Sequence, residues 1–275
     1  MSLPIFPPAD DPGPSFTDLL RRSDPDQPLG PTPRSARDAQ TPAATGPDVR
    51  HGTTVAALRY GDGVVMAGDR RATEGYSIAH RAIEKVFAAD RYSAVAFAGA
   101  AGPGIEMVKL FQTQLEHYEK VEGLALSLEG KANQLGQMIR GNLGMAMQGL
   151  AVLPLYAGYD LRRRIGRIFN YDLTGGRYEE ADYHATGSGG RDARTTIKLG
   201  YREGMARDEA IELAILALYE AADEDIATGG PDVVRGIYPM VATVTADGFE
   251  LASEPEVGQR FGVLIERKRA EGQRP

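Results

Sequence analysis

The sequence predicts an α+β domain arranged as a four-layer α-β-β-α sandwich, in which two antiparallel sheets lie between two outer pairs of helices. The first observation is the order of the elements, which runs strands, two helices, strands again and then helices. The second is that short turns join the first four strands into two hairpins. Two antiparallel sheets with a pair of helices on each outer face satisfy this order of elements.

Residues 1–52 precede this domain and are predicted to stay unfolded. They are rich in Pro, Asp, Ser and Gly and carry few large apolar side chains, so burial cannot offset the entropy lost on ordering. The stretch 16–22 could form a helical turn or dock on the domain. Residues 1–52 are either a disordered tail or a propeptide that is removed on maturation, and residues 53–275 form the folded domain.

The first hairpin brings an acidic residue to the start of the domain. Residues 53–60 and 64–70 are typical of strands, and Gly61-Asp62-Gly63 between them is a turn signal. A turn centred near Asp62 pairs residues whose numbers add to roughly 122–124. Thr53 is therefore expected opposite residues 69–71, and Asp69 is brought close to it.

The second hairpin places a lysine beside a glycine-rich segment. Residues 85–89 and 92–99 are predicted strands, joined by a turn at 90–91. In this register Lys85 pairs near Ala96 or Phe97, and the small residues 99–102 follow just beyond it. A lysine inside a sheet needs a partner because an unpaired buried charge is costly.

The remaining elements follow from apolar periodicity and from turn signals. A helix is expected from Pro103 to about Gly123, and a second one over roughly 127–149. Strands are expected within 151–185, a short helix after 186–190, and a helix over 206–222 that leads into the polar loop 223–230. Strands at 234–245 and 249–252 and a charged C-terminal helix complete the domain.

Composition disfavours several classes of function. The 275 residues carry a net charge of -7, which gives no bias toward nucleic acid or anionic membranes. There is no cysteine, and the four histidines lack metal-ligand spacing, so we expect no metal and no cofactor. With only four histidines, a Ser-His-Asp triad is also disfavoured. The apolar runs are too short to span a bilayer and the start does not resemble a secretory signal, so a cytoplasmic location is expected.

The junction between Gly52 and Thr53 is a candidate cleavage site. Cleavage there would leave Thr53 with a hydroxyl nucleophile and a free α-amine on one residue. An α-amine has a pKa of roughly 7.7–8.0, so it can act as a base near neutral pH. Taken alone, a Gly-Thr pair more often marks a transition from loop to strand.

The chain contains, in this order, the stretches 52–55, 68–73, 84–86, 98–99, 187–189, and Asp225 followed by 228–230. Together they resemble the β subunit of a 20S proteasome, a threonine peptidase with the N-terminal-nucleophile hydrolase fold. Three more, 117–120, 140–143 and 234–239, resemble the actinobacterial type in particular. The resemblance covers roughly residues 51–265.

The resemblance implies a set of catalytic residues. Thr53 would be the nucleophile, freed by autocatalytic cleavage after Gly52 and assisted by its own α-amine. Lys85, paired with Asp69, would lower the pKa of the hydroxyl or assist proton transfer, unless the two form only a structural ion pair. The Gly99 N–H would form the oxyanion hole. The side chains implied to orient the amine are those of Ser188, Asp225 and Thr228, the last standing where many members have serine.

The resemblance also implies how a peptide substrate binds. The backbone of Thr73 would pair with an extended peptide. Apolar side chains would line the pocket for the substrate residue before the scissile bond, which favours hydrophobic substrates, although each could equally belong to the core. These pocket residues are Ala72, Ile83, Phe87, Phe97 and Ala101.

The implied partners are β subunits in seven-membered rings, capping rings of proteasome α subunits, and an ATPase regulator that feeds unfolded or tagged proteins through the α ring. Two other functions stay open. One is an N-terminal-nucleophile amidase for small molecules or a relative that works without α subunits, and the other is a ring subunit with a dead site. The presence of Thr53, Asp69 and Lys85 together argues against a dead site.

Overall fold

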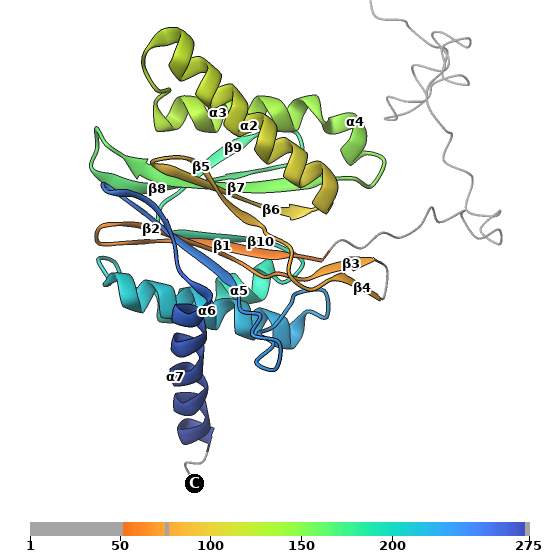
Figure 1. Cartoon of the computed structure of the whole chain (residues 1–275), viewed down its shortest axis with the longest axis vertical. Coiled ribbons are helices and arrows are strands. Elements are labelled where there is room, and N and C mark those ends of the chain that lie inside the picture. The colour runs from red at the N-terminus through yellow and green to blue at the C-terminus, as the bar shows by residue number, and fades with distance from the viewer. Residues whose placement is uncertain (1–51, 75–76, 273–275) are drawn as a thin grey trace, which may run out of the picture. The chain divides into compact units, whose positions relative to one another are not determined.

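The computed structural model describes residues 52–74 and 77–272 and has the predicted α+β sandwich (Figure 1). Two five-stranded antiparallel sheets are stacked face to face, and helices cover their outer faces. The predicted helical turn at 16–22 lies outside the described residues. No helix in the described part of the chain is long and apolar enough to cross a membrane.

The first sheet has the strand order β10-β1-β2-β11-β12. Its strands are β1 (Thr54–Tyr60), β2 (Gly63–Gly68), β10 (Tyr183–Gly187), β11 (Met240–Thr245) and β12 (Gly248–Leu251). Val55 pairs with Gly68, so the residue numbers of each β1–β2 pair add to 123, within the predicted range. The register of the first hairpin is therefore confirmed.

The second sheet has the strand order β5-β6-β7-β8-β9. Its strands are β5 (Val86–Asp90), β6 (Ser93–Gly99), β7 (Val152–Asp160), β8 (Ile165–Tyr171) and β9 (Arg177–Glu180). The backbone N–H of Phe97 donates to the Lys85 carbonyl at 3.3 Å, so the predicted pairing of Lys85 is also confirmed. A small hairpin of β3 (Ala72–Glu74) and β4 (Ser77–His80), which the sequence analysis did not predict, precedes this sheet.

Helices α2 (Ala101–Glu122) and α3 (Leu128–Gly141) cover the second sheet, and α5 (Gly190–Gly200) and α6 (Arg207–Glu224) cover the first (Figure 1). The C-terminal helix α7 (Glu254–Gly272) contacts α6. Strand β1 is buried on both faces, with Ala56 and Leu58 toward the α5–α6 layer and Val55 and Ala57 toward the other sheet. Alternation along the strand thus supplies two separate apolar layers.

Two predicted boundaries are wrong. The helix expected over 127–149 ends at Gly141, because the backbone of Asn142 leaves the helical conformation with a φ of -94° and a ψ of 7°. Only the short α4 (Leu143–Ala146) follows. The strand expected over 234–245 begins only at Met240. Residues 231–239 instead form a turn closed by an Asp232–Ile237 bridge, in which Gly236 has a φ of 69°.

Candidate active site

Thr53 lies immediately before β1, and its side chain is almost fully buried, with 3% exposure. Its hydroxyl donates a hydrogen bond to the carbonyl oxygen of Gly52 at 2.6 Å. Its backbone N–H donates to Ser188 Oγ at 3.2 Å, and the Ser188 N–H donates to the Thr53 carbonyl at 2.9 Å. The peptide bond between Gly52 and Thr53 is therefore held where the start of β1 meets the end of β10.

Asp69 follows β2 directly and is fully buried. One carboxylate oxygen accepts the Thr54 N–H at 2.8 Å and Lys85 Nζ at 2.7 Å. The other accepts the N–H of Arg71 at 2.9 Å and of Gly229 at 2.8 Å. The residue whose backbone contacts Asp69 is thus Thr54, one position beyond Thr53, which the sequence analysis had expected to face Asp69.

Lys85 comes from the other sheet and is 1% exposed. Its ammonium donates to Asp69 Oδ1 and also to the Arg71 carbonyl. Burial lowers the pKa of Lys85 below its usual value, while the negative charge of Asp69 acts in the opposite direction. The pair links the two sheets next to the start of β1, and it is the pairing that the resemblance implied.

Asp225 directly follows α6 and accepts hydrogen bonds from the hydroxyls of Ser188 and Thr228, the two residues that the resemblance implied beside it. Ser188 Oγ and Thr228 Oγ1 both donate to its Oδ2, the latter at 2.6 Å. The Ala227 N–H donates to its Oδ1 at 3.1 Å. The structure thus brings Ser188, Asp225 and Thr228 together, and Ser188 links this group to the nitrogen of Thr53.

Thr54 is a further member of the site that the sequence analysis did not assign. Its side chain is fully buried. Its Oγ1 accepts the Gly189 N–H at 3.0 Å and lies 2.6 Å from Thr228 Oγ1. Because Thr228 gives its own proton to Asp225, Thr54 is the donor in this pair. The repeated Thr-Thr after Gly52 was the available signal, yet nothing local to it identifies Thr228 as its partner.

Gly99 ends β6 in a conformation that favours glycine. Its φ is 107°, and a Cβ there would lie 2.1 Å from the Ala151 carbonyl oxygen. The segment 99–102 runs directly into α2, so the small residues next to the site are fixed by a helix start on one side and a strand pair on the other.

The residues predicted for substrate binding are Thr73, which was assigned to the peptide backbone, and five apolar residues assigned to the side-chain pocket. Thr73 contacts the leader, because its Oγ1 accepts the Gly52 N–H at 3.1 Å. Phe87 and Phe97 stack with ring centroids 6.1 Å apart, and Phe97 is 1% exposed in the layer beneath α2. The other predicted lining residues are Ala72 in β3, half-buried Ile83 before β5, and Ala101 at the start of α2.

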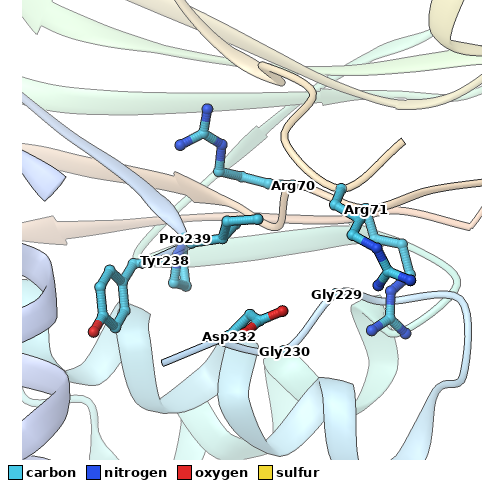
Figure 2. Close-up of a pocket in the computed structure, with 9 residues that line it drawn as sticks. Arg70, Arg71, Gly229, Gly230, Asp232, Tyr238 and Pro239 are labelled. Carbon is cyan, nitrogen blue, oxygen red and sulfur yellow. The ribbon is translucent and has the colours of Figure 1, made fainter. Parts of the chain in front are cut away.

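A small cavity of about 30 Å³ adjoins the site and is walled by the segment after Asp69 and by the loop after α6 (Figure 2). Arg70 and Arg71 extend from this segment in different directions, so their guanidinium groups do not converge on one point (Figure 2). Arg70 Nη1 pairs with Glu254, and Arg71 Nη1 donates to the Ile226 carbonyl at 3.0 Å. Among the described residues, no group of three or more His, Asp or Glu could hold a metal ion.

Comparisons with known proteins agree with this geometry. Residues 49–235 match a family model described as "Proteasome subunit". A protein named "Proteasome subunit beta" from Acidimicrobium ferrooxidans is 56% identical over 276 residues, which cover 100% of this chain and 97% of the relative. A protein of the same name from Streptomyces griseus is 57% identical over 218 residues, or 79% of this chain and 78% of the relative.

Proposed function

This chain belongs to the proteasome subunit family, and from that premise we propose that Thr53 is the nucleophile of its peptidase centre. The chain is a proteolytic proteasome β subunit and a threonine-type endopeptidase. The main support for assigning Thr53 as the nucleophile is a distance: its hydroxyl oxygen lies 2.6 Å from the carbonyl oxygen of Gly52. The reacting groups of a self-cleavage are therefore already adjacent in the full-length chain.

Maturation proceeds by transfer of an acyl group from nitrogen to oxygen. The Thr53 hydroxyl oxygen attacks the Gly52 carbonyl carbon, and the bond from that carbon to the Thr53 nitrogen breaks. The hydroxyl proton ends on the released nitrogen, which becomes the α-amine. Water then hydrolyses the ester, so residues 1–52 leave as a propeptide and residues 53–275 remain with Thr53 at the N-terminus. Before this step the Thr53 nitrogen is an amide and cannot serve as a base, so the full-length chain is a zymogen.

In the mature chain, the freed amine takes the proton of the Thr53 hydroxyl as it attacks a substrate carbonyl. Ser188 lies 3.2 Å from this nitrogen and is held by Asp225, which also holds Thr228. These three side chains orient the amine toward the hydroxyl. The Gly99 N–H stabilises the oxyanion, a role whose loss typically slows such reactions by 100-fold or more.

Lys85 and Asp69 supply fixed charge beneath the nucleophile. Both are excluded from water, so the field of the ammonium is weakly screened. A positive charge near the hydroxyl stabilises its deprotonated form and lowers its pKa. The three backbone N–H groups that bind Asp69 keep this carboxylate in place against the ammonium.

Thr73 contacts the leader and the substrate through different atoms. Its Oγ1 accepts the Gly52 N–H in the uncleaved chain, and after cleavage its backbone pairs with an extended peptide. Ala72, Ile83 and Ala101 line the pocket for the residue before the scissile bond. Phe87 stacks on buried Phe97, and the bulk of Phe97 shortens the proposed pocket. An apolar lining of this kind favours hydrophobic substrate residues.

The β subunit assembles into a proteasome together with α subunits. We propose that it does so in seven-membered β rings, in the cytoplasm, and that an ATPase regulator delivers unfolded or tagged proteins through the α ring. The family assignment supports these partners, and native mass spectrometry of the chain co-produced with its α partner measures the ring size. Assembly of active rings without any α subunit would contradict this part of the proposal.

The decisive experiment is intact-mass and N-terminal analysis of the assembled protein. We expect a chain that begins at Thr53 and hydrolyses unstructured polypeptides. Thr53→Ala should keep residues 1–52 and show no peptidase activity, because it lacks the hydroxyl. Thr54→Ser, in the neighbouring position, keeps a hydroxyl and should still be cleaved before Thr53. A processed and active Thr53→Ala chain would refute the assignment, and activity on small amides but not on polypeptides would favour an amidase.

A further inference from the structure

Gly52 is pressed against Ala227, a residue of the loop that carries Asp225 and Thr228. A methyl group on Gly52 would lie 1.8 Å from the Cβ of Ala227 and 2.7 Å from its Cα. It would also lie 2.8 Å from the Ala227 carbonyl oxygen. Optimal carbon–carbon separations are about 3.5–4.0 Å, so residue 52 or residue 227 would have to move by more than about 1 Å to admit the methyl.

Ala227 cannot retreat without disturbing the site. Its own N–H donates to Asp225 Oδ1 at 3.1 Å. On one side, the Ile226 carbonyl is bound by Arg71, and on the other, the Gly229 N–H is bound by Asp69. Moving residue 227 therefore displaces a segment anchored at both ends to groups that contact Lys85 or Ser188.

Gly52 is equally fixed from its own side. Its N–H donates to Thr73 Oγ1, and its carbonyl oxygen accepts the hydroxyl of Thr53. If residue 52 retreats from Ala227, the carbonyl that must be attacked leaves the nucleophile. A side chain at position 52 therefore displaces either the Gly52 carbonyl from the Thr53 hydroxyl or the loop that carries Asp225 and Thr228.

We infer that Ala227 is a specificity-determining residue for leader removal, which restricts position 52 to glycine by direct contact. This inference rests on the proposed self-cleavage at Gly52–Thr53 and adds the residue that selects what may precede the scissile bond. After cleavage the leader is gone, so the restriction concerns maturation. The requirement is for space beside Ala227, and it should therefore be relieved by making that space.

The test compares the rate of leader removal in five full-length chains, one of them Ala227→Gly alone, produced with their α partner and followed by intact mass. Gly52→Ala should mature about 100-fold more slowly than the parent, the order expected for a displacement of about 1 Å. Gly52→Ala with Ala227→Gly should mature roughly tenfold faster than Gly52→Ala alone. The rescue is partial because the Ala227 Cα and carbonyl remain close. Gly144→Ala, at an exposed position with open space around it, should mature at the parent rate.

Each outcome has a separate meaning. If the parent chain never begins at Thr53, the proposed function fails and the role of Ala227 fails with it. If the parent matures but the double variant is no faster than Gly52→Ala, the proposed function stands and Ala227 does not select glycine. Maturation of Gly52→Ala at the parent rate also overturns the inference.

A structural measurement decides the case in which Ala227→Gly by itself slows cleavage. Crystal structures of the uncleaved Thr53→Ala chain, with and without Gly52→Ala, compare the positions of residues 52 and 227. We expect one of the two segments to move by about 1 Å or more when the methyl is added, since the contact leaves no room for it. If both segments keep their positions, the contact is not restrictive and the inference is wrong.

Discussion

Replacing Thr54 with valine tests the hydrogen-bond chain that reaches from β1 to Asp225. Valine keeps the branched shape at Cβ and the volume of threonine, so the strand and its packing are preserved. The change removes one hydroxyl, which accepts the Gly189 N–H at 3.0 Å and donates to Thr228 at 2.6 Å. Thr54 and Thr228 are both fully buried, so water cannot replace the lost partner.

The expected loss of stability follows from these two contacts. A buried donor left without a partner costs about 1–3 kcal/mol, and the Gly189 N–H becomes such a donor. The second bond, between hydroxyls, contributes about 0.5–1.5 kcal/mol. We therefore expect Thr54→Val to lower the free energy of unfolding by about 2–4 kcal/mol.

Urea unfolding of the full-length chain measures this loss, with Thr53→Ala as the parent so that cleavage does not differ between samples. Thr243→Val is the matched control, since Thr243 is also a buried strand threonine, 2% exposed, but its hydroxyl makes no hydrogen bond to any described residue. The control should stay within about 0.5 kcal/mol of the parent. Equal losses for the two variants would refute the reasoning, because shape rather than the hydroxyl would then account for both.

Three further changes test the buried pair, the oxyanion glycine and the loop anchor. Burial keeps the pKa of Lys85 in the folded chain below its usual 10.5. At a pH between the folded-state pKa and 10.5, the unfolded chain therefore binds more protons than the folded one. The unfolding free energy of the Thr53→Ala parent should therefore rise with pH in that window, and adding Lys85→Met should remove the rise; identical slopes would contradict this. Gly99→Ala should abolish peptidase activity and destabilise the chain by about 1–3 kcal/mol or more, because Gly99 has a φ of 107° and an added Cβ would clash with the Ala151 carbonyl. The control Gly102→Ala, at an exposed position and measured by the same assays, should change neither activity nor stability. Arg71→Met frees the Ile226 carbonyl and should slow leader removal several-fold in an intact-mass time course, and an unchanged rate would show that the loop does not need this anchor.

The position of each charged residue within its own hairpin could be predicted from the sequence, because both hairpins have short turns. The turn at Gly61-Asp62-Gly63 and the alternation of β1 and β2 leave little freedom in register, and the structure has the pairs adding to 123. The second hairpin likewise fixes Lys85 opposite Phe97. Each local geometry therefore places its charged residue within its own hairpin, but the pairing of Asp69 with Lys85 across the two sheets was implied only by the resemblance.

The hydroxyl half could not be predicted in this way. Thr53 contacts Ser188 across 135 residues, and Thr54 contacts Thr228 across 174. No periodicity connects such distant positions, and Asp225 lies in a loop whose course depends on how α6 packs on the first sheet. Those residues were identified from the resemblance alone, and the role of Thr54 became visible only in the structure.

The wrong boundaries share a physical cause, which is that apolar residues were taken to be buried. Leu143 continues the spacing of α3, but it is 36% exposed and follows the Asn142 cap. Val233 and Val234 look like the start of a strand, yet they are 66% and 95% exposed in the turn before β11. The β3–β4 hairpin was missed for the opposite reason. Its strands have only three and four residues, Ala72 and Thr73 are half-buried and all of β4 is exposed, so no pattern of burial can be detected.

The direction of the hydrogen bonds explains how one set of side chains can serve the chain before and after cleavage. In the uncleaved chain the Thr53 N–H donates to Ser188, and Ser188 donates to Asp225. In parallel, Thr54 donates to Thr228, which donates to the same carboxylate oxygen. Under the proposed mechanism, cleavage converts an amide nitrogen into an amine that still donates to Ser188 but gains a lone pair for the hydroxyl proton. No donor or acceptor has to reverse its role, so breaking one peptide bond is sufficient to turn the self-cleaving arrangement into a peptidase.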